Sequence, residues 1–421
     1  MAADPLRVLI VGLNYAPEPS GSAPYTAGLA AELAARGHDV KVVTTHPHYP
    51  QWRVEHDGPR DLTERLDGVT VRRLSTYVPS QPRAPHRFAY ELLFGARAAL
   101  SRLPEADVIV FTSPALFTTA LTMARLRGRH AGRVVWVQDL YGKGVAETDI
   151  TNKGFAPFVA RVEAAVLRQA DRVVTIHPNM QRAIVEDLGV AEDRTTVVRN
   201  WTHLEPRPAP DREAVRDRLG WPQDKVIALH SGNMGYKQGL EVLVDAAKII
   251  DREGLPIEIV LVGDGNQRRT LEERAKGVAS VRFVDPLPGD DYQDAMAAAD
   301  VLLLVDRPGV GSMAVPSKLT SYFTTGNPVL GSTDPSGNAG VEIRDSGGGR
   351  VCPPGDAQAI VDEIMWLHEH PGEAAHMGQA GRDFMARVLS KDTAVDAIEA
   401  LLRSVATTAL RTGRGKRAKN T

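Results

Sequence analysis

One lysine follows a glycine-rich turn in a setting that suits the binding of an anion. The segment Leu229–Leu240 begins as a buried strand, passes through a turn containing Gly232 and Gly235, and reaches Lys237 just before a helix. Small residues let backbone amides approach an anion, and a nearby ammonium group neutralises its charge. We expect Lys237 to hold a diphosphate at the carboxyl end of this strand. The alternative is a solvated lysine at a helix start.

A second anion-binding signal lies within Gly309–Leu330. There a glycine-rich loop leads into a helix with Pro316 near its first position. The free amides and the positive end of the helix dipole suit a phosphate. Ser317 adds a hydroxyl and Lys318 a cation, so we expect Val315, Pro316, Ser317 and Lys318 to grip the same diphosphate. The alternative is a well-capped structural helix.

Two further turns carry weaker signals. Gly263 and Asp264 follow a buried strand, where the aspartate either contacts a ligand or caps the helix that starts near Gln267. Gly21 and Ser22 end a long loop between the first strand and a helix, where their amides either face an anion or form a plain connection. This loop does not read Gly-x-Gly-x-x-Gly, so the dinucleotide-binding fingerprint is absent.

Composition and missing motifs exclude several function classes. A formal net charge of -2 gives no field that favours nucleic acid, and the single cysteine, Cys352, cannot form an internal disulfide or a cysteine-based zinc site. Asp-x-Asp, His-Glu-x-x-His and Gly-x-Ser-x-Gly are all absent. We therefore expect no metal ion and no cofactor. No secretion signal or apolar run of about 20 residues is visible, which favours a cytoplasmic protein.

The elements that must position these residues form two similar series. Short apolar runs rich in β-branched residues alternate with amphipathic stretches, which is typical of parallel strands covered by helices on both faces. The fold class is therefore α/β, with two Rossmann-like doubly wound domains facing a central cleft, where ligands lie at the carboxyl ends of the strands. The expected strands are Arg7–Val11, Val40–Thr44, Val69–Leu74, Val108–Thr112, Arg133–Val137, Val173–Ile176 and Thr196–Arg199, then Lys225–His230, Ile257–Val262, Val281–Val284, Val301–Val305 and Pro328–Leu330.

The two series are separated by a proline-rich segment. Glu205–Pro210 has proline at alternate positions, which indicates an extended linker. We predict a first domain over residues 1–204, a second over 205–384, and a last part over 385–421 that crosses back to the first domain. The basic stretch Arg411–Thr421 contains no acidic residue, and we expect it to be disordered.

Taken together and in this order, these segments resemble the retaining glycosyltransferases of family 4, which have the GT-B fold. The likeness covers nearly the whole chain and points to bacterial members of colanic-acid, O-antigen and capsule synthesis. The segments that carry it are Asn14–Pro19, Gln138–Tyr141, Asn200-Trp201, Gly232–Leu240, Val262–Gly265, and Pro316–Leu319 followed by Gly326.

The resemblance assigns roles in the second domain and also shows departures from the family pattern. It implies that Lys237 holds the donor diphosphate. Asn233 stands where many members have arginine, and Lys318 would compensate for that lost cation. The family's paired glutamates fall on Met313 and Ser321, neither of which is acidic. Ser321 is left to donate a single hydrogen bond to the ribose.

In the first domain the resemblance places Gly21 and Ser22 against the donor phosphates. Asp139 is the candidate for the position where some members use a histidine near the reacting sugar; the alternative is an aspartate that caps its loop.

The reaction that the resemblance implies is a retaining transfer from a nucleotide-diphosphate sugar, with UDP as the expected nucleotide, to a hydroxyl of a lipid-linked glycan or a small molecule. The family is usually described by a same-face displacement in which the diphosphate leaves and helps to deprotonate the acceptor. Two other readings stay open. One is a catalytically silent partner or binding subunit. The other is a further GT-B activity, such as a nucleotide-sugar epimerase or a pseudo-glycosyl coupling enzyme.

Residues 83–102 combine arginines with aromatic and aliphatic residues. Such a helix is suited to an anionic membrane surface, where a lipid-linked acceptor would reside. This predicts peripheral contact with the inner face of the cell membrane. The alternative is an ordinary helix packed on the sheet with a solvated basic edge.

Overall fold

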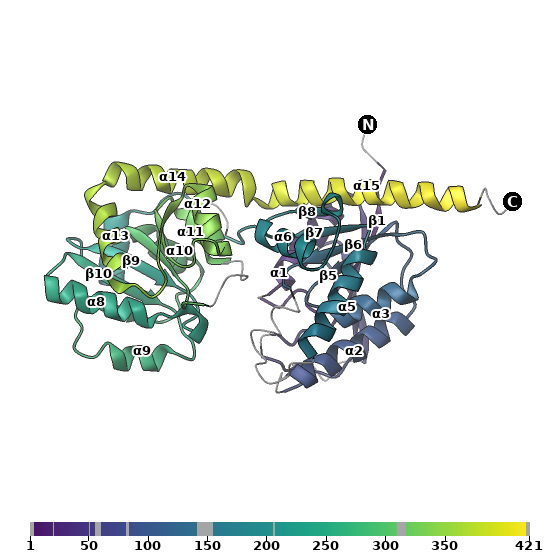
Figure 1. Ribbon diagram of the computed structural model, residues 1–421, viewed down its shortest axis with the longest axis horizontal. Coiled ribbons are helices and arrows are strands. Elements are labelled where there is room, and N and C mark those ends of the chain that lie inside the picture. Colours follow the sequence, from purple (N-terminus) through teal and green to yellow (C-terminus); the bar gives the residue numbers. More distant parts are fainter. Residues whose placement is uncertain are drawn as a thin grey trace. The chain divides into compact units, whose positions relative to one another are not determined.

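The computed structural model describes residues 4–19, 21–49, 51–54, 60–80, 84–140, 155–204, 207–309 and 317–417. The chain divides into two compact units (Figure 1). Unit 1 comprises Met1–Arg199 together with Asp392–Thr421, and unit 2 comprises Asn200–Lys391. Each unit is built around its own sheet, so the expected α/β class with two doubly wound parallel sheets is confirmed.

The described part of unit 1 contains an eight-stranded sheet with the order β3-β4-β2-β1-β5-β6-β7-β8. All neighbouring strands are parallel except β3 and β4, which are antiparallel. The strands are β1 (Arg7–Val11), β2 (Asp39–Thr45), β3 (Asp61–Leu66), β4 (Val69–Leu74), β5 (Val108–Thr112), β6 (Gly132–Val137), β7 (Arg172–Thr175) and β8 (Thr195–Val197).

The edge strand β3 is a difference from the sequence prediction. Its residues alternate between exposed and half-buried, and half of them are charged, so β3 shows none of the apolar runs that mark the other strands. It pairs with β4 through a tight turn at Asp67 and Gly68, both of which have positive φ angles of 49° and 80°. An Asp-Gly pair is a recognised hairpin signal, and it was the available clue to this strand.

The helices of unit 1 cover both faces of its sheet (Figure 1). At Gly95, α2 approaches the backbone of α3 so closely that an added Cβ would lie 2.8 Å from Thr118 Cα. The helices are α1 (Ala23–Ala35), α2 (Ala84–Leu100), α3 (Leu116–Arg125), α5 (Phe155–Gln169), α6 (Pro178–Glu186) and α15 (Lys391–Arg417), with a 3-10 turn η1 (Glu192–Arg194).

The C-terminal helix α15 packs on unit 1 through apolar residues and through a cluster of charges. At Gly132 an added Cβ would lie 2.3 Å from Val405 Cγ1, and Glu399 accepts hydrogen bonds from Arg36 and Arg403. The expected disorder of the basic segment from Arg411 is wrong as far as Arg417, because α15 continues to that residue. Once a helix is nucleated by packing, each added turn costs little, even in a basic sequence.

Unit 2 is built on a parallel sheet that has six strands among its described residues, in the order β11-β10-β9-β12-β13-β14. The strands are β9 (Val226–Ser231), β10 (Ile257–Val262), β11 (Val281–Val284), β12 (Val301–Val305), β13 (Val329–Ser332) and β14 (Gly349–Cys352). The helices are α7 (Arg212–Leu219), α8 (Glu241–Glu253), α9 (Arg268–Arg274), α10 (Gly289–Ala298), α11 (Ser317–Thr325), α12 (Asn338–Ser346), α13 (Ala357–Glu369) and α14 (Pro371–Val388), with a 3-10 turn η2 (Tyr236–Gln238).

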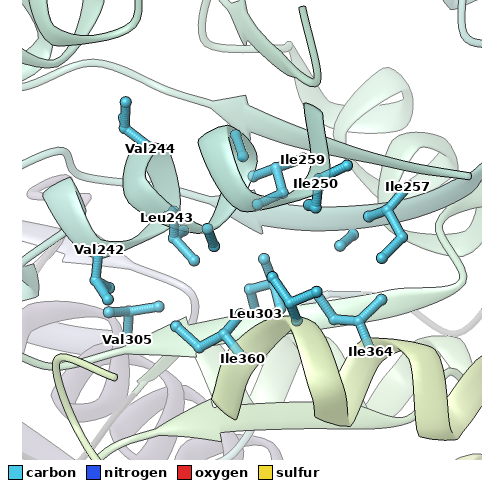
Figure 2. Close-up of a cluster of buried hydrophobic side chains, with 14 of the residues drawn as sticks. Val242, Leu243, Val244, Ile250, Ile257, Ile259, Leu303, Val305, Ile360 and Ile364 are labelled. Atoms are coloured by element: carbon cyan, nitrogen blue, oxygen red, sulfur yellow. The ribbon is translucent and has the colours of Figure 1, made fainter. Parts of the chain in front are cut away.

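Both faces of this sheet are apolar, as a sheet covered by helices on both sides requires. Successive residues of a strand point to opposite faces, so Ile257 and Ile259 enter one core while Val260 and Val262 enter the other. Figure 2 shows the first core, where side chains of α8, α13, β10 and β12 meet. The two cores fix the carboxyl ends of the strands, from which the connecting loops emerge.

The proline-rich segment before α7 lies outside the described residues at positions 205 and 206. Its described part, residues 207–210, has no regular secondary structure. Arg207 pairs with Asp290 of α10 at 3.1 Å, so this part of the segment is attached to unit 2. Among the described residues, no helix has the length and apolar character that crossing a bilayer requires.

Candidate functional site

The loops after β9 and β10 pack directly on each other at the carboxyl edge of the unit 2 sheet. The backbone N–H of Gly232 donates to Val262 O at 2.8 Å, and that of Met234 donates to Asp264 O at 2.8 Å. A Cβ at Gly263 would lie 2.0 Å from Gly232 O, so only glycine fits there. This contact explains the glycines of the two loops by close backbone approach.

Asn233 and Asp264 are exposed on these loops. The Asn233 side chain lies between two glycines. A Cβ added at Gly235 would lie 2.8 Å from Asn233 Nδ2, and one added at Gly265 would lie 2.7 Å from Asn233 Oδ1. Asp264 accepts a hydrogen bond from the N–H of Gly265 at 2.7 Å. The alternative of a helix cap is wrong, because α9 begins after Gln267 and has no side-chain cap.

The turn that carries Lys237 is held in place by contacts with Arg307, which follows β12. The N–H of Arg307 donates to Lys237 O at 3.0 Å, and its guanidinium lies 3.9 Å from the centre of the Tyr236 ring. Arg307 also pairs with Glu241 at the start of α8. Lys237 itself is exposed. Its backbone is therefore held rigidly while its side chain faces outward at the end of β9.

Lys318, in the first turn of α11, reaches the end of the same strand. Its Nζ lies 3.0 Å from Nε2 of His230, the penultimate residue of β9. The Lys318 side chain passes over Gly232, where an added Cβ would lie only 2.9 Å from its Cε. Burial lowers the pKa of Lys318 to about 8, and the nearby Asp306 carboxylate opposes that shift without cancelling it.

Asp306 and His230 complete the surroundings of Lys318. Asp306, directly after β12, accepts a hydrogen bond from Thr333 Oγ1 at 2.6 Å, and burial raises its pKa. His230 is fully buried, and burial and the Lys318 charge lower its pKa well below the usual value. In the described part of the chain, no group of three or more histidine, cysteine or acidic side chains is arranged to hold a metal ion.

The start of α11 is only partly described. Val315, Pro316 and Met313 lie outside the described residues, so the structure does not describe the loop that was expected to grip a phosphate. Ser317 is exposed as the first residue of α11, and Ser321 is half-buried one turn later.

The expected site residues of unit 1 lie in two places: Gly21 and Ser22 directly before α1, and Asp139 in the turn after β6. Gly21 has a φ of 68°, and Ser22 is the N-cap of α1 but makes no side-chain capping bond. Asp139 follows β6 with an exposed side chain. Ser113 anchors this turn, because its Oγ accepts from the N–H of Asp139 at 3.1 Å and donates to Asp139 O at 3.1 Å.

The sequence analysis did not identify His230 and Asp306 as site residues. The available signals were His230, a histidine in an otherwise apolar strand, and Asp306, an aspartate directly after a second apolar strand. Neither belongs to a motif. Their relation to Lys318 depends on strand order, because β9 and β12 are neighbours although 69 residues separate Ser231 from Val301 in the sequence.

Comparison with known proteins gives a family for both units. Residues 20–201 match the glycosyl transferase 4-like domain, and residues 211–384 match the glycosyl transferases group 1 family. The chain is 30% identical over 410 residues to WcaI of Escherichia coli (strain K12), a glycosyl transferase assigned to colanic acid biosynthesis. That alignment covers 92% of this chain and 97% of WcaI.

Solved structures support the same fold. HepE of Anabaena in complex with UDP superposes with a TM-score of 0.70 at 16% identity, covering 94% of this chain and all of HepE. WaaG, a glycosyltransferase involved in lipopolysaccharide biosynthesis, gives a TM-score of 0.64 at 18% identity, covering 93% and 99% of the two chains. The fold is therefore GT-B, and the chain belongs to the group 1 glycosyltransferases with a glycosyl transferase 4-like first domain.

Proposed function

We propose that the protein is a retaining glycosyltransferase that uses a nucleotide-diphosphate sugar as donor, and that unit 2 holds the diphosphate at the carboxyl end of β9. The observation that carries this proposal is Lys318, an ammonium group held over Gly232 whose sole hydrogen-bond partner among the described residues is the neutral His230. A cation without a hydrogen-bonded carboxylate keeps its charge available for an anion. Lys237, on the loop after the same strand, supplies a second cation.

The chemistry that these groups supply is electrostatic. The bond between the anomeric carbon and the diphosphate oxygen breaks, and the acceptor hydroxyl forms the new bond on the same face of the sugar. The proton of that hydroxyl passes to the departing diphosphate. Lys237 and Lys318 stabilise the negative charge that grows on the leaving group, and the positive end of the α11 dipole, which begins at Ser317, adds to this stabilisation.

The remaining predicted contacts keep their roles within the proposal. Asn233, Gly263 and Asp264 lie on the two packed loops, where backbone amides approach the donor. Ser321 donates a single hydrogen bond to the ribose of the donor. In unit 1, Gly21 and Ser22 approach the phosphates and Asp139 lies near the reacting sugar. We propose UDP as the nucleotide, since HepE structures hold UDP and UDP-glucose, and we propose that no metal ion takes part.

Donor turnover tests this function directly. The full chain is incubated with UDP-, GDP- and dTDP-sugars, and release of the nucleoside diphosphate is followed with time. The proposal predicts slow release from at least one donor, and the anomeric configuration of the glycosylated product will match that of the donor by NMR. No release from any donor in the presence of candidate acceptors would contradict the enzymatic role. An inverted product would contradict the retaining mechanism alone.

For the acceptor we propose a lipid-linked glycan reached from a membrane surface, with the protein on the cytoplasmic side. One face of α2 packs against α3. The opposite face exposes Leu93 (49%) and Leu100 (86%), and Phe158 of α5 is also exposed (49%). Arg87 and Arg97 are exposed on α2, although Arg97 pairs with Asp61 at 2.8 Å. Exposed apolar residues beside basic ones suit an anionic lipid surface.

Sedimentation with vesicles of phosphatidylcholine and phosphatidylglycerol checks this surface. The wild-type chain is expected to pellet with anionic vesicles, and Leu93→Asp with Leu100→Asp to reduce pelleting several-fold. A small-molecule acceptor becomes the better account if the wild-type chain stays in the supernatant.

A further inference from the structure

His230 is a fully buried residue to which the proposed chemistry gives no role. We propose that His230 is a positioning residue of the donor site: its Nε2 accepts a hydrogen bond from the Lys318 ammonium and holds that ammonium over Gly232, at the end of β9. This inference rests on the function proposed above. Because His230 has no exposed surface, it cannot touch a ligand and must act through Lys318.

The hydrogen bonds of the ring fix which nitrogen carries the proton. His230 Nδ1 lies 3.1 Å from the carbonyl oxygen of Leu303 in β12. A carbonyl oxygen can only accept, so Nδ1 is the donor and the neutral ring has its lone pair on Nε2. Nε2 is therefore an acceptor, and the Lys318 ammonium 3.0 Å away is its donor.

A neutral acceptor suits this role better than a carboxylate. A carboxylate bonded to Lys318 would neutralise the charge and compete with an incoming diphosphate. The neutral imidazole directs the ammonium and leaves its charge in place. Asp306 is close enough to influence the pKa of Lys318, but its carboxylate accepts its hydrogen bond from Thr333.

The surroundings leave Lys318 little freedom. Tyr322, four residues further along α11, accepts from the N–H of Ser231 at 3.0 Å and donates to Leu303 O at 3.3 Å. Lys318 and Tyr322 thus attach one face of α11 to β9 and β12. The titratable groups that face Lys318 and the end of β9 include Asp306, which raises the pKa of Lys318, and Tyr322 on α11. The hydroxyl of Tyr292 of α10 lies 3.5 Å from Ser231 Oγ, next to His230 in the sequence.

Two substitutions of His230 distinguish the role of Nε2, which contacts Lys318, from that of Nδ1, which contacts Leu303 O. In His230→Gln the longer amide can place its oxygen where Nε2 lies and still accept from Lys318. In His230→Asn the shorter amide can still donate to Leu303 O but cannot reach Lys318. Both variants are polar and uncharged, so they differ mainly in whether Lys318 keeps a hydrogen-bond acceptor: it does in His230→Gln and does not in His230→Asn. His368→Asn on the exposed end of α13 is the matched control.

The experiment measures the dissociation constant of UDP, with GDP and dTDP as further probes, by calorimetry on the full chain. We expect His230→Asn to weaken binding about tenfold or more, since a hydrogen bond to a charged group is lost. His230→Gln is expected to stay within about threefold of the wild type, and His368→Asn to have no effect. In a Lys318→Met background, His230→Asn should have no further effect, because the two residues act as a unit.

Equal weakening by His230→Asn with and without Lys318 would overturn the inference, because it would indicate a structural role. So would unchanged binding in His230→Asn. If wild type and Lys318→Met bind UDP equally well, nucleotide binding stands, but the proposed role of Lys318 fails and this inference fails with it. If the wild type binds none of the three nucleotides, the proposed function fails and the inference fails with it.

If His230→Asn does not fold, as seen by circular dichroism, His230→Gln decides. Its UDP affinity is then expected to weaken above about pH 8, as in the wild type, because the same ammonium loses its proton. A flat profile in both proteins would overturn the role of Lys318 and of His230 together.

Discussion

A buried carboxylate in unit 1 and a largely buried ammonium in unit 2 occupy corresponding places, each at the carboxyl edge of its sheet, and they are treated differently. Glu18, in the loop after β1, is only 5% exposed. Its Oε1 accepts from the backbone N–H groups of His48 and Tyr49, each at 2.9 Å, and its Oε2 accepts from Asn14 at 2.9 Å. Lys318 has one hydrogen-bond partner among the described residues, and that partner is neutral.

The difference teaches how to tell a structural charge from a binding charge. Each donor around Glu18 belongs to the protein, so the carboxylate joins the β1 loop to the β2 loop and has little capacity left for a ligand. Lys318 is desolvated without full compensation, which costs stability and is retained where function requires it. Removing the Glu18 charge should therefore lower stability, whereas removing the Lys318 charge should leave it level or raise it.

Loss of turnover in Lys237→Ala is the largest expected effect. Removing a group that stabilises the departing diphosphate is expected to lower kcat by about 10² to 10³-fold. Thermal unfolding should change little, because the Lys237 side chain is exposed. Release of nucleoside diphosphate measures the first quantity and circular dichroism the second. Lys276→Ala, which removes the same charge after the far end of α9, is the control, and equal turnover in the two variants would contradict the assignment.

Replacement of Glu18 by alanine should destabilise the protein. The three N–H groups that it satisfies would lose their acceptor inside the protein, at a cost of roughly 3 kcal/mol in the free energy of unfolding. Denaturant titration followed by fluorescence measures this loss. Glu32→Ala on α1 serves as a carboxylate control outside the network, and a Glu18→Ala variant as stable as wild type would remove one side of the comparison.

Replacement of Lys318 by methionine supplies the other side. Methionine fills similar space without a charge, so the free energy of unfolding should stay level or rise by roughly 1 kcal/mol, while UDP binding weakens at least tenfold. Denaturant titration and calorimetry on the same preparation measure both quantities. A large fall in stability would place Lys318 with Glu18 as a structural charge.

The pH dependence of stability in the wild type and in Lys318→Met gives a finer test. The folded-state pKa of Lys318 is about 8, against an ordinary value of 10.5, so the unfolded chain binds more protons between these values. The stability difference between Lys318→Met and wild type should therefore be constant below about pH 8 and shrink as the pH rises above it. UDP binding by the wild type should weaken over the same range, because the ammonium loses its charge. Unfolding curves and UDP titrations from pH 7 to 10 check both trends.

The smallest expected effect concerns the contact of α15 with unit 1. Burial alone would raise the pKa of Glu399, but hydrogen bonds from Arg36, Arg403 and His38 outweigh it and lower the pKa to about 2. The resulting stability is complete above the ordinary pKa of 4.5 and is lost as the pH falls through about 2. Glu399→Gln should cost about 1 kcal/mol at pH 7, with the difference from wild type shrinking toward pH 3. A difference that does not depend on pH would contradict the ion-pair account.

Most of the fold could be predicted from local pattern, and the site only in part. Parallel strands buried on both faces are recognisable in the sequence as apolar runs. The edge strand β3 is polar and has no such run, so the sequence analysis did not predict it. Lys237 and Lys318 follow glycine-rich segments and could be named from the sequence. The bond between Lys318 and His230 could not be foreseen, because it depends on the side chain of α11 reaching back over Gly232 to β9, a contact between residues that lie 88 positions apart.

The most direct test of the account is a calorimetric titration of the full chain with UDP-, GDP- and dTDP-sugars, repeated on Lys318→Met and on the control Lys276→Met. The account predicts that the wild type and the control bind at least one donor with equal affinity and that Lys318→Met binds it at least tenfold more weakly. Equal affinity in all three proteins would contradict the claim that Lys318 holds the diphosphate.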